Sequence, residues 1–478
     1  MGSFYFYDLE TSGVNARTSR IMQFGGIRTD EDFAIQDEWM THVALTDEVL
    51  PEPDAVFITE ITPQMTQQDG LTEAEFLAEF SKRALKRNTT IVGFNTIRFD
   101  DEFMRYTLWR NYYDAYEWQW RDGRSRWDLL DVVRMMRALR PEGIEWPIED
   151  GKPTNRLELL TKANNIDHGD AHDALADTRA TLELAKLIRQ KQPKLFDFLL
   201  EARKKEVVIE HISPKKPRPF VYTSGRYSSD YEKTTAAIVL APHPTNSNGH
   251  LVYDLRVDPT QFADWTTQQI AQRAFMSYRD RQESGLDEFP VKILQVNKAP
   301  AVAPLGVLDD TAQKRIKLSV ADIESNLKKL ASMENFAQRV YDAWNRDNNF
   351  RSANDPDVQL YDGFLNDDDR EHMRHVQKLS GSELKGLTPP FKDDRLKQMW
   401  PRYVARNFPN ALSDDQRQDW EAYRARRLSE GVAGSLTLER YFRRLQQLAQ
   451  RSGLTEQQQF LLEEMQLYGQ SIAPEFDA

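Results

Sequence analysis

The chain has no cysteine and no long hydrophobic run. The lack of cysteine excludes disulfides, zinc–thiolate sites and thiol catalysis, and it is compatible with a reducing compartment. Because no run of about 18 apolar residues occurs, we expect no transmembrane helix. The N-terminus carries no basic residue ahead of its first apolar stretch, so we also expect no signal peptide. Together these absences predict a cytoplasmic protein.

The chain also lacks an excess of basic residues over acidic ones. The 478 residues carry a net charge of -12, which argues against a protein that coats nucleic acid without specificity. Residues 1–192 contain 34 acidic and 23 basic residues, whereas the rest of the chain is nearly balanced. The acidity therefore concentrates in the first part of the chain, where bound divalent cations would offset part of it.

The chain is too long for one ordinary hydrophobic core, so two or three domains are expected. In the first part, the aromatic residues 4–7 predict a buried strand that ends at Asp8. Further strands are predicted over residues 20–29, 33–43 and 89–94, and helices over 73–86, from 101, and over 127–139, 156–163 and 173–190. This order indicates an α/β sheet of mixed direction.

Two connections follow this first part. A stretch rich in proline and lysine covers residues 213–219, and short strand-like runs come after it, which predicts a small β-rich domain. The polar, acidic residues 345–369 are interpreted as a second connection, after which the pattern is helical. We therefore expect three domains, at residues 1–192, 193–348 and 349–478.

Asp8 and Glu10 are separated by one residue at the end of the first predicted strand. Alternation along a strand places both side chains on one face, where each raises the pKa of the other unless a cation neutralises them. Mg²⁺ prefers oxygen ligands and usually keeps several waters, so a few carboxylates and a substrate phosphate complete its shell. Two such ions about 3.5–4 Å apart can stabilise the attacking and leaving oxygens of an in-line displacement.

Three residues further along the chain complete this pattern. Asp100 and Asp177 would supply the remaining metal ligands, and His172 precedes Asp177 by five positions. The imidazole of His172 can take a proton from the attacking water, because histidine is the side chain best suited to proton transfer near neutral pH. Taken singly, each residue has an ordinary structural role as its alternative, such as a helix cap or a solvated helix face. Their joint occurrence, in this order, favours a two-metal phosphodiester hydrolase.

These residues form recognisable motifs. DEDD exonucleases of the histidine subclass, which have a ribonuclease H-like fold, carry three motifs that resemble Asp8-x-Glu10-Thr11, Asn95-x-x-x-Phe99-Asp100 and His172-x-x-x-x-Asp177. Segments that also resemble the bacterial exodeoxyribonuclease I family lie at residues 139–144, 156–164, 360–364 and 406–409. The chain is therefore similar to this family over nearly its whole length.

The resemblance implies both a fold and an activity. The fold is an α/β ribonuclease H-like exonuclease domain, then an SH3-like β-rich domain and an α-helical C-terminal domain. The activity is processive 3′–5′ degradation of single-stranded DNA to 5′-mononucleotides in DNA repair, with two Mg²⁺ ions that Mn²⁺ can replace. The family spacing places a metal ligand directly after Phe99, which favours Asp100 over Asp101. Asp101 is then expected to begin the next helix.

The resemblance also implies substrate contacts. Arg156 would hold the DNA backbone near the scissile phosphate, since a guanidinium fork matches phosphate oxygens. Residues 105–134 interleave basic and aromatic side chains, as single-strand binding requires, although part of these aromatics are equally expected in the core. The substrate-binding candidates are Glu10, Arg156, Arg105, Tyr116, Trp120, Arg134 and Lys205.

A protein partner and two rival functions stay open at this point. The family docks the acidic C-terminal tail of single-stranded DNA-binding protein, and Arg140, Phe198 and Arg218 are candidate pieces of that pocket, or equally ordinary surface residues. A 3′–5′ exoribonuclease of the same superfamily is one rival, because the 2′-hydroxyl is recognised by pocket shape rather than by these motifs. A catalytically silent DNA-binding protein is the other, and all five intact residues argue against it. A monomer is expected.

Overall fold

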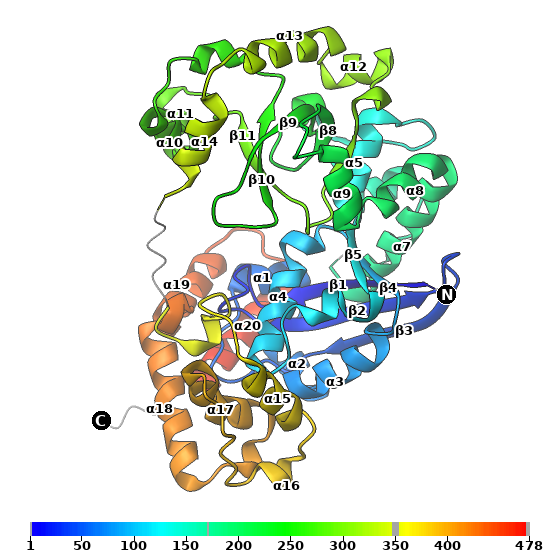
Figure 1. The fold of residues 1–478 in the computed structure, drawn as a ribbon. Helices are drawn as coiled ribbons and strands as arrows, with labels where there is room; N and C mark the ends of the chain where they lie inside the picture. The colour runs from blue at the N-terminus through cyan, green and yellow to red at the C-terminus, as the bar shows by residue number, and fades with distance from the viewer. Residues whose placement is uncertain (1, 170–171, 347–352, 475–478) are drawn as a thin grey trace. The chain divides into compact units, whose positions relative to one another are not determined.

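The computed structural model of the chain describes residues 2–169, 172–346 and 353–474 (Figure 1). It contains two compact units, which do not follow the order of the chain. The first unit comprises Met1–Ser125, His168–Arg179 and Phe350–Ala478. The second unit comprises Arg126–Asp167 and Ala180–Asn349. Within the described ranges, no helix combines the length and apolar character that crossing a membrane requires.

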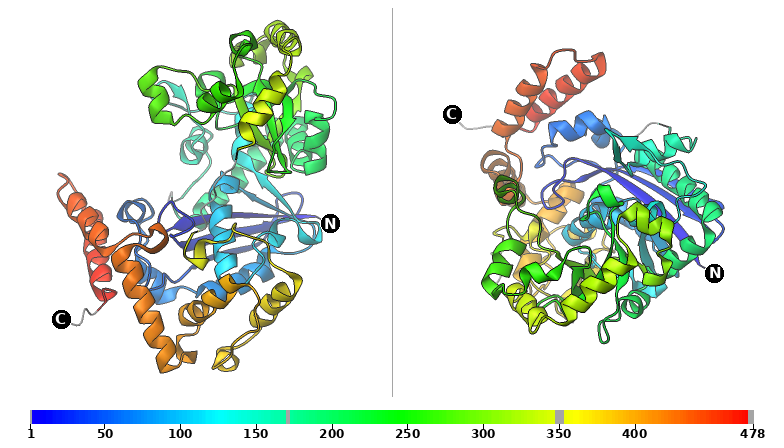
Figure 2. Two further views of the ribbon diagram at one scale, coloured as in Figure 1. Left: turned by 60° about the vertical axis from the view of Figure 1, so that its left-hand side comes forward. Right: turned by 90° about the horizontal axis from the view of Figure 1, so that it is seen from above.

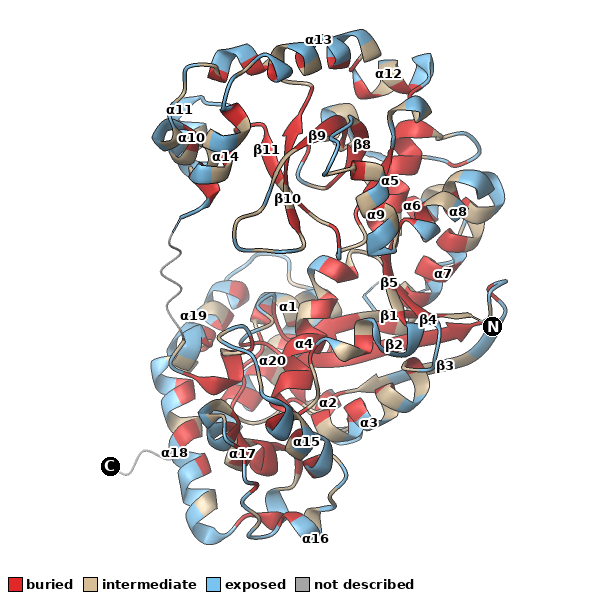
Figure 3. Cartoon of the chain, viewed as in Figure 1, coloured by how far each residue is buried: buried red, intermediate tan, exposed pale blue. Residues whose placement is uncertain are grey.

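A mixed β-sheet, of which all strands but the last lie in the first unit, forms the centre of that unit. Its strand order is β3-β2-β1-β4-β5, where the strands are β1 (Ser3–Thr11), β2 (Ile21–Thr29), β3 (Ile35–His42), β4 (Thr89–Gly93) and β5 (Ser125–Asp128). The first three strands pair antiparallel, and β4 pairs parallel with β1. Every residue of β2 is buried, as Figure 3 shows. The mixed direction expected from the sequence is confirmed.

Some predicted boundaries in this part of the chain are wrong. The first strand does not end at Asp8 but continues to Thr11, so that Asp8 and Glu10 both lie within it. The predicted helix over 127–139 begins two residues later, as α5 (Leu129–Leu139), because Trp127 belongs to β5. Asp128 ends the strand and caps the helix, since its side chain accepts a hydrogen bond from the backbone N–H of Leu130.

Several helices of the N-terminal part belong to the first unit together with this sheet. They are α1 (Pro53–Thr59), α2 (Pro63–Asp69), α3 (Glu73–Ala84), α4 (Asp100–Arg110) and the beginning of α7 (Ala174–Lys191). Helix α3 begins at a capping box formed by Thr72 and Glu75, and its apolar side chains join the core of the sheet. Helix α4 begins at Asp100, one residue before the predicted start.

The C-terminal helices belong to the same unit and share its cores. They are α15 (Asp367–Val376), α16 (Gly381–Leu384), α17 (Asp394–Asn407), α18 (Asp414–Glu430), α19 (Leu438–Ala449) and α20 (Glu456–Ser471), and Figure 2 shows the last two as a neighbouring pair. Tyr112 of the N-terminal part packs against Trp400 and Tyr403 of α17. A second core joins Val49 to Tyr441 of α19.

Part of the acidic segment interpreted as a second connection is buried rather than exposed. Pro356–Val358 form a buried 3-10 helix, and Asp355 and Asp357 are only 2% and 1% exposed. Arg402 and Arg406 of α17 form ion pairs with these two carboxylates. Acidic composition suggested solvent exposure, but arginines distant in the sequence supply the compensating charge.

The second unit contains the predicted β-rich domain. Its antiparallel sheet has the order β11-β10-β9-β8-β12, with β8 (Phe220–Thr223), β9 (Thr234–Pro242), β10 (Gly249–Asp254), β11 (Val291–Gln295) and β12 (Ala301–Pro304). Its helices include α5, α6 (Leu157–Ala163), α8 (Pro193–Glu201), α9 (Lys205–Ile212), α10 (Thr267–Ala274), α11 (Tyr278–Ser284), α12 (Asp310–Ile316), α13 (Val320–Ala331) and α14 (Phe336–Trp344). The sequence interpretation missed β12, the helices α8 and α9, and the five helices from α10 to α14.

Candidate active site

Glu10, His172 and Asp177 come together in the first unit. One potential ligand atom from each side chain lies within 4.8 Å of the other two. Strand β1 supplies Glu10, the first turn of α7 supplies Asp177, and His172 lies two residues before that helix. Residues 162 positions apart in the sequence thus meet at one end of the sheet, with two carboxylates and an imidazole facing a common point.

The remaining two predicted ligands, Asp8 and Asp100, belong to the same cluster. Burial raises the pKa of Asp8 well above its usual value, and further increases come from Asp100, Asp177, Glu10 and Asp173. Burial followed by the charges of Asp177, Asp100 and Asp173 raises the pKa of Glu10 to about 9. Each of these contributing charges is a carboxylate. The donor set, carboxylate oxygens with one imidazole, therefore fits divalent cations that prefer hard ligands.

Gln23 attaches the start of α7 to the sheet beside Glu10. It lies opposite Glu10 in the pairing of β1 with β2. Its amide donates to Oδ2 of Asp173 at 2.9 Å and accepts from the backbone N–H of Ala174 at 2.8 Å. The other carboxylate oxygen of Asp173 caps α7 by accepting from the N–H groups of Leu175 and Ala176. These hydrogen bonds hold the first turn of α7, and with it Asp177, in a fixed position relative to Glu10 on the neighbouring strand.

Gly25 allows α7 to lie directly against β2. A Cβ atom at this position would lie 2.2 Å from the carbonyl oxygen of Ala174. The hydroxyl of Thr178 in α7 donates to the Gly25 carbonyl at 3.2 Å, so a hydrogen bond also joins the helix to the strand at this point. Gly25 pairs with Asp8 in the sheet, so this close approach occurs beside a predicted metal ligand.

The two neighbouring aspartates at the start of α4 have different surroundings. Asp101 accepts a hydrogen bond from the hydroxyl of Tyr7 at 2.6 Å and is 1% exposed. Asp100 instead adds its charge to the cluster around Asp8 and Glu10. Of the two, Asp100 is thus the one that lies with the other carboxylates, and Asp101 serves the packing between β1 and α4.

Three polar residues near the site were missed from the sequence. His168 contacts a carboxylate oxygen of Asp177 through Nε2, and Gln23 and Asp173 form the attachment described above. Asp173 had a detectable signal, since an aspartate just ahead of a helical pattern is a typical cap. His168 and Gln23 had none, because their contacts depend on how the chain folds back on itself.

The candidate DNA contacts of the first unit differ in exposure. Trp120 and Tyr116 are 61% and 41% exposed, so their ring faces are accessible for stacking. Arg105 is largely buried, with its guanidinium 5.6 Å from the ring of Tyr116 and one N–H donated to Gln119 at 3.1 Å. It also forms an ion pair with Glu102.

The other candidates belong to the second unit, where each has a polar partner. Arg156 precedes α6 and forms ion pairs with Glu149, at 2.7 Å, and with Glu158. The side chain of Arg156 is 55% exposed, so a phosphate can compete for its donors. Arg134 pairs with Asp131 at 2.7 Å, and Lys205 donates to Asn248 at 2.6 Å.

The chain matches three family models in the order expected from the sequence. They are the Exonuclease model at residues 5–185, the Exonuclease I SH3-like domain at 203–346 and the Exonuclease I C-terminal domain at 354–472. Exodeoxyribonuclease I of Haemophilus influenzae is 38% identical over 432 residues, covering 90% of this chain and 91% of the relative. The chain belongs to the exodeoxyribonuclease I family.

Solved structures of this family have the same fold. Exonuclease I from Methylocaldum szegediense superposes with a TM-score of 0.93 at 40% identity, over 99% of this chain and 100% of its own. Escherichia coli Exonuclease I in complex with a dA16 oligonucleotide superposes with a TM-score of 0.94 at 35% identity, with the same coverage. The expected exonuclease, SH3-like and C-terminal parts are thus confirmed.

Proposed function

We propose that this chain is a processive 3′–5′ exonuclease that degrades single-stranded DNA to 5′-mononucleotides during DNA repair and recombination. The observation that carries this proposal is the cluster of Asp8, Glu10, Asp100 and Asp177 beside His172, in a member of the exodeoxyribonuclease I family. The complex of a solved relative with a dA16 oligonucleotide supports the substrate class.

Two divalent cations are proposed to bind the four carboxylates of this cluster. Mg²⁺ is the proposed ion, with Mn²⁺ as a substitute, because both accept oxygen ligands in this number. When bound, such ions stabilise the attacking and leaving oxygens of phosphodiester hydrolysis. A zinc-bound form and a metal-free form are both known among solved complexes of the E. coli enzyme with single-stranded DNA.

His172 is proposed to accept the proton of the attacking water at an imidazole nitrogen. Its position supports this role, because a ring nitrogen lies within 4.8 Å of oxygens from Glu10 and Asp177. His172 has a φ of 70°, in the left-handed region that a residue with a Cβ rarely adopts. The Asp173 cap directly after it supplies an anchor for this conformation.

Substrate binding is proposed to combine phosphate and base contacts. Arg156 holds the backbone near the scissile phosphate, and Tyr116 and Trp120 stack on bases. The further contacts proposed are Glu10, Arg105, Arg134 and Lys205. DNA is favoured over RNA by the SH3-like and C-terminal parts, which the family models describe as parts of Exonuclease I.

A protein partner is proposed for the second unit. Arg140 forms an ion pair with Asp309 at 3.1 Å, and the ring of Phe198 lies 5.0 Å from that of His211. Together with Arg218 they are proposed to bind the acidic C-terminal tail of single-stranded DNA-binding protein. An SSB/Exonuclease I structure with the inhibitor CFAM is known among the relatives.

The proposal has three further parts. We propose domain boundaries after residues 192 and 348, a monomeric state and a cytoplasmic location.

The polarity and sugar specificity can be tested with end-labelled oligonucleotides. A 5′-labelled single strand should be converted in Mg²⁺ to short end products with few intermediate lengths, whereas a 3′-labelled one should release labelled mononucleotide at once. The matching RNA should persist, and EDTA should stop both reactions. Faster loss of RNA would favour the exoribonuclease, and binding of DNA without cleavage would favour the silent binding protein.

A further inference from the structure

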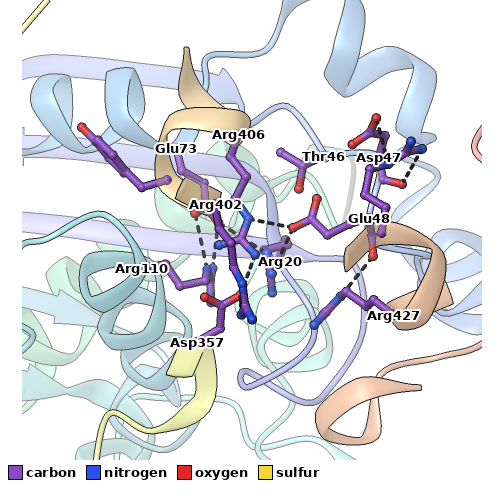
Figure 4. A network of polar contacts seen from close by, with 12 residues as sticks. Arg20, Thr46, Asp47, Glu48, Glu73, Arg110, Asp357, Arg402, Arg406 and Arg427 are labelled. Atoms are coloured by element: carbon purple, nitrogen blue, oxygen red, sulfur yellow. Dashed lines mark hydrogen bonds and ion pairs between the residues drawn. The ribbon is translucent and has the colours of Figure 1, made fainter. Parts of the chain in front are cut away.

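Buried charged side chains join the C-terminal helices to the loop of residues 12–20, which we call the β1–β2 loop (Figure 4). This loop follows the strand that carries Glu10. Its ends are tied together, because the N–H of Ser12 donates to the carbonyl of Arg20 at 2.9 Å and the N–H of Arg20 donates to the Ser12 hydroxyl at 2.8 Å. The residues between them form a closed loop whose tip must be positioned by other contacts.

The tip of the β1–β2 loop forms part of a cavity of about 500 Å³. Residues 14–17 line it together with Arg98 and Phe99, which directly precede Asp100, and with Tyr361 of the C-terminal part. The cavity therefore lies between the segment that follows Glu10 and the segment that precedes Asp100. Its shape depends on the position of the loop.

The carbonyl of Thr18 in the β1–β2 loop accepts two guanidinium donors. Arg20 donates to it at 3.2 Å from within the loop, and also to the carbonyl of Ser19 at 3.1 Å. Arg427 of α18 donates to it at 3.0 Å and, through Nε, to the carbonyl of Glu48 at 3.0 Å. Arg427 is 1% exposed and thus bridges two backbone segments of the exonuclease part from inside the protein.

A second arginine from the C-terminal helices acts on the loop through a carboxylate. Arg406 of α17 pairs with Glu48 at 2.8 Å, and the same Glu48 oxygen lies 3.5 Å from Arg20. Burial alone raises the pKa of Glu48, but Arg406, Arg20 and Arg427 lower it to about 2. Figure 4 shows Arg406 between Glu48 and Asp357. Arg406 also donates a hydrogen bond to the carboxylate of Asp357 at 2.5 Å.

We propose that Arg427 and Arg406 are positioning residues of the nuclease, which fix the β1–β2 loop so that its tip holds the 3′-terminal nucleotide. This inference rests on the proposed function. A guanidinium is required at residue 427 because its planar fork reaches two carbonyls at once, which a lysine ammonium does not. A small displacement of a positioning group is enough to lower turnover strongly.

The test compares Arg427→Lys with the wild type on two substrates. One is a single-stranded oligonucleotide, and the other is the p-nitrophenyl ester of thymidine 5′-monophosphate, which contains only one nucleotide. We expect kcat to fall by about tenfold or more on both substrates. Binding of the oligonucleotide in EDTA should stay within about twofold, since the proposed phosphate and stacking contacts lie elsewhere. Arg406→Lys should show the same pattern.

Tyr441→Phe serves as a matched control. It removes a buried hydrogen bond from the Tyr441 hydroxyl to the carbonyl of Met465, between α19 and α20, and leaves the hydrogen bonds of Arg427 and Arg406 in place. It should lower the melting temperature but leave kcat unchanged. Amide exchange of residues 12–20 should accelerate in Arg427→Lys and Arg406→Lys but not in Tyr441→Phe.

The outcomes separate the two proposals. Wild-type kcat on the ester in both folded lysine variants, or an equal loss of kcat in Tyr441→Phe, would overturn the positioning role. Unchanged exchange of residues 12–20 in the lysine variants would overturn it as well, even where catalysis cannot be measured. A wild-type protein that hydrolyses neither substrate would refute the proposed function itself.

Discussion

At the scale of single residues, the carboxylates of the site repel one another. Burial and neighbouring negative charges raise the pKa values of both Asp8 and Glu10, the latter to about 9. A structural role would not require such a cluster, since buried carboxylates are usually paired with cations. The cluster is therefore best explained as a site completed by metal ions.

The raised pKa values predict a pH-dependent effect of metal on stability. Glu10 ionises near pH 4.5 when unfolded but near 9 when folded, so its protonated form favours the folded state at low pH and this contribution is lost as the pH rises towards 9. In EDTA, the melting temperature should therefore decrease between about pH 5 and pH 9 relative to Glu10→Gln. Mg²⁺ should restore it, with a larger shift at pH 8 than at pH 6. Equal shifts at the two pH values would contradict this explanation.

His172→Ala tests the proposed proton acceptor. Turnover of single-stranded DNA should fall by about 10²–10⁴-fold, because general base catalysis contributes that much. DNA binding in a gel-shift measurement should be retained, since no proposed phosphate or stacking contact is removed. Unchanged turnover would show that another group accepts the proton.

The candidate site residues were easier to predict from the sequence than the residues that hold them in place. The five candidate residues could be found from the sequence because each belongs to a short motif, and the structure brings them to one place. Gln23 and His168 could not be found, because their contacts link segments about 150 and 9 residues apart that only the fold aligns.

At the scale of secondary-structure elements, the contact between β2 and α7 sets the geometry of the site. It places Asp177 at the first turn of the helix, next to the strand that carries Glu10. The hydrophobic pattern was sufficient to find both elements, since their apolar residues follow strand and helix periods. Their mutual approach was not predictable, because it depends on a missing side chain at Gly25.

Gly25→Ala should disturb this contact. The added Cβ would lie 2.2 Å from the carbonyl oxygen of Ala174, so α7 must move away from the strand. We expect a loss of roughly 1–3 kcal/mol in the free energy of unfolding and a larger proportional loss of nuclease activity. Gly306→Ala is the control, since nothing lies within 4 Å of the corresponding Cβ and no effect is expected. Equal effects of the two substitutions on chemical denaturation would refute the close-packing argument.

At the scale of the whole molecule, the C-terminal helices are part of the fold of the exonuclease part rather than an appended domain. Tyr112, which is fully buried, packs against Phe391 at 5.1 Å and donates from its hydroxyl to the carbonyl of Leu396 at 2.7 Å. The order of the three parts was predictable from motifs and composition. The cores that these parts share were not predictable. The acidic composition of residues 355–357, for example, gives no sign that distant arginines pair with them inside the protein.

Removal of residues 350–478 should therefore destabilise the exonuclease part. The truncation exposes the apolar faces around Tyr112 and Val49 and leaves Glu48 without Arg406. We expect the shortened chain to aggregate or to lose its cooperative thermal transition, as circular dichroism and size-exclusion chromatography would show. A monodisperse, cooperatively folding fragment would contradict the shared-core interpretation.

The most direct test of the central claim compares two adjacent carboxylates. Asp100→Asn and Asp101→Asn differ by one position, but only Asp100 joins the charge cluster, whereas Asp101 accepts the hydrogen bond of Tyr7. Degradation of a 5′-labelled single-stranded oligonucleotide in Mg²⁺ should fall by more than about 100-fold in Asp100→Asn and by much less in folded Asp101→Asn. Wild-type rates in Asp100→Asn would contradict the assignment of this cluster as the nuclease site.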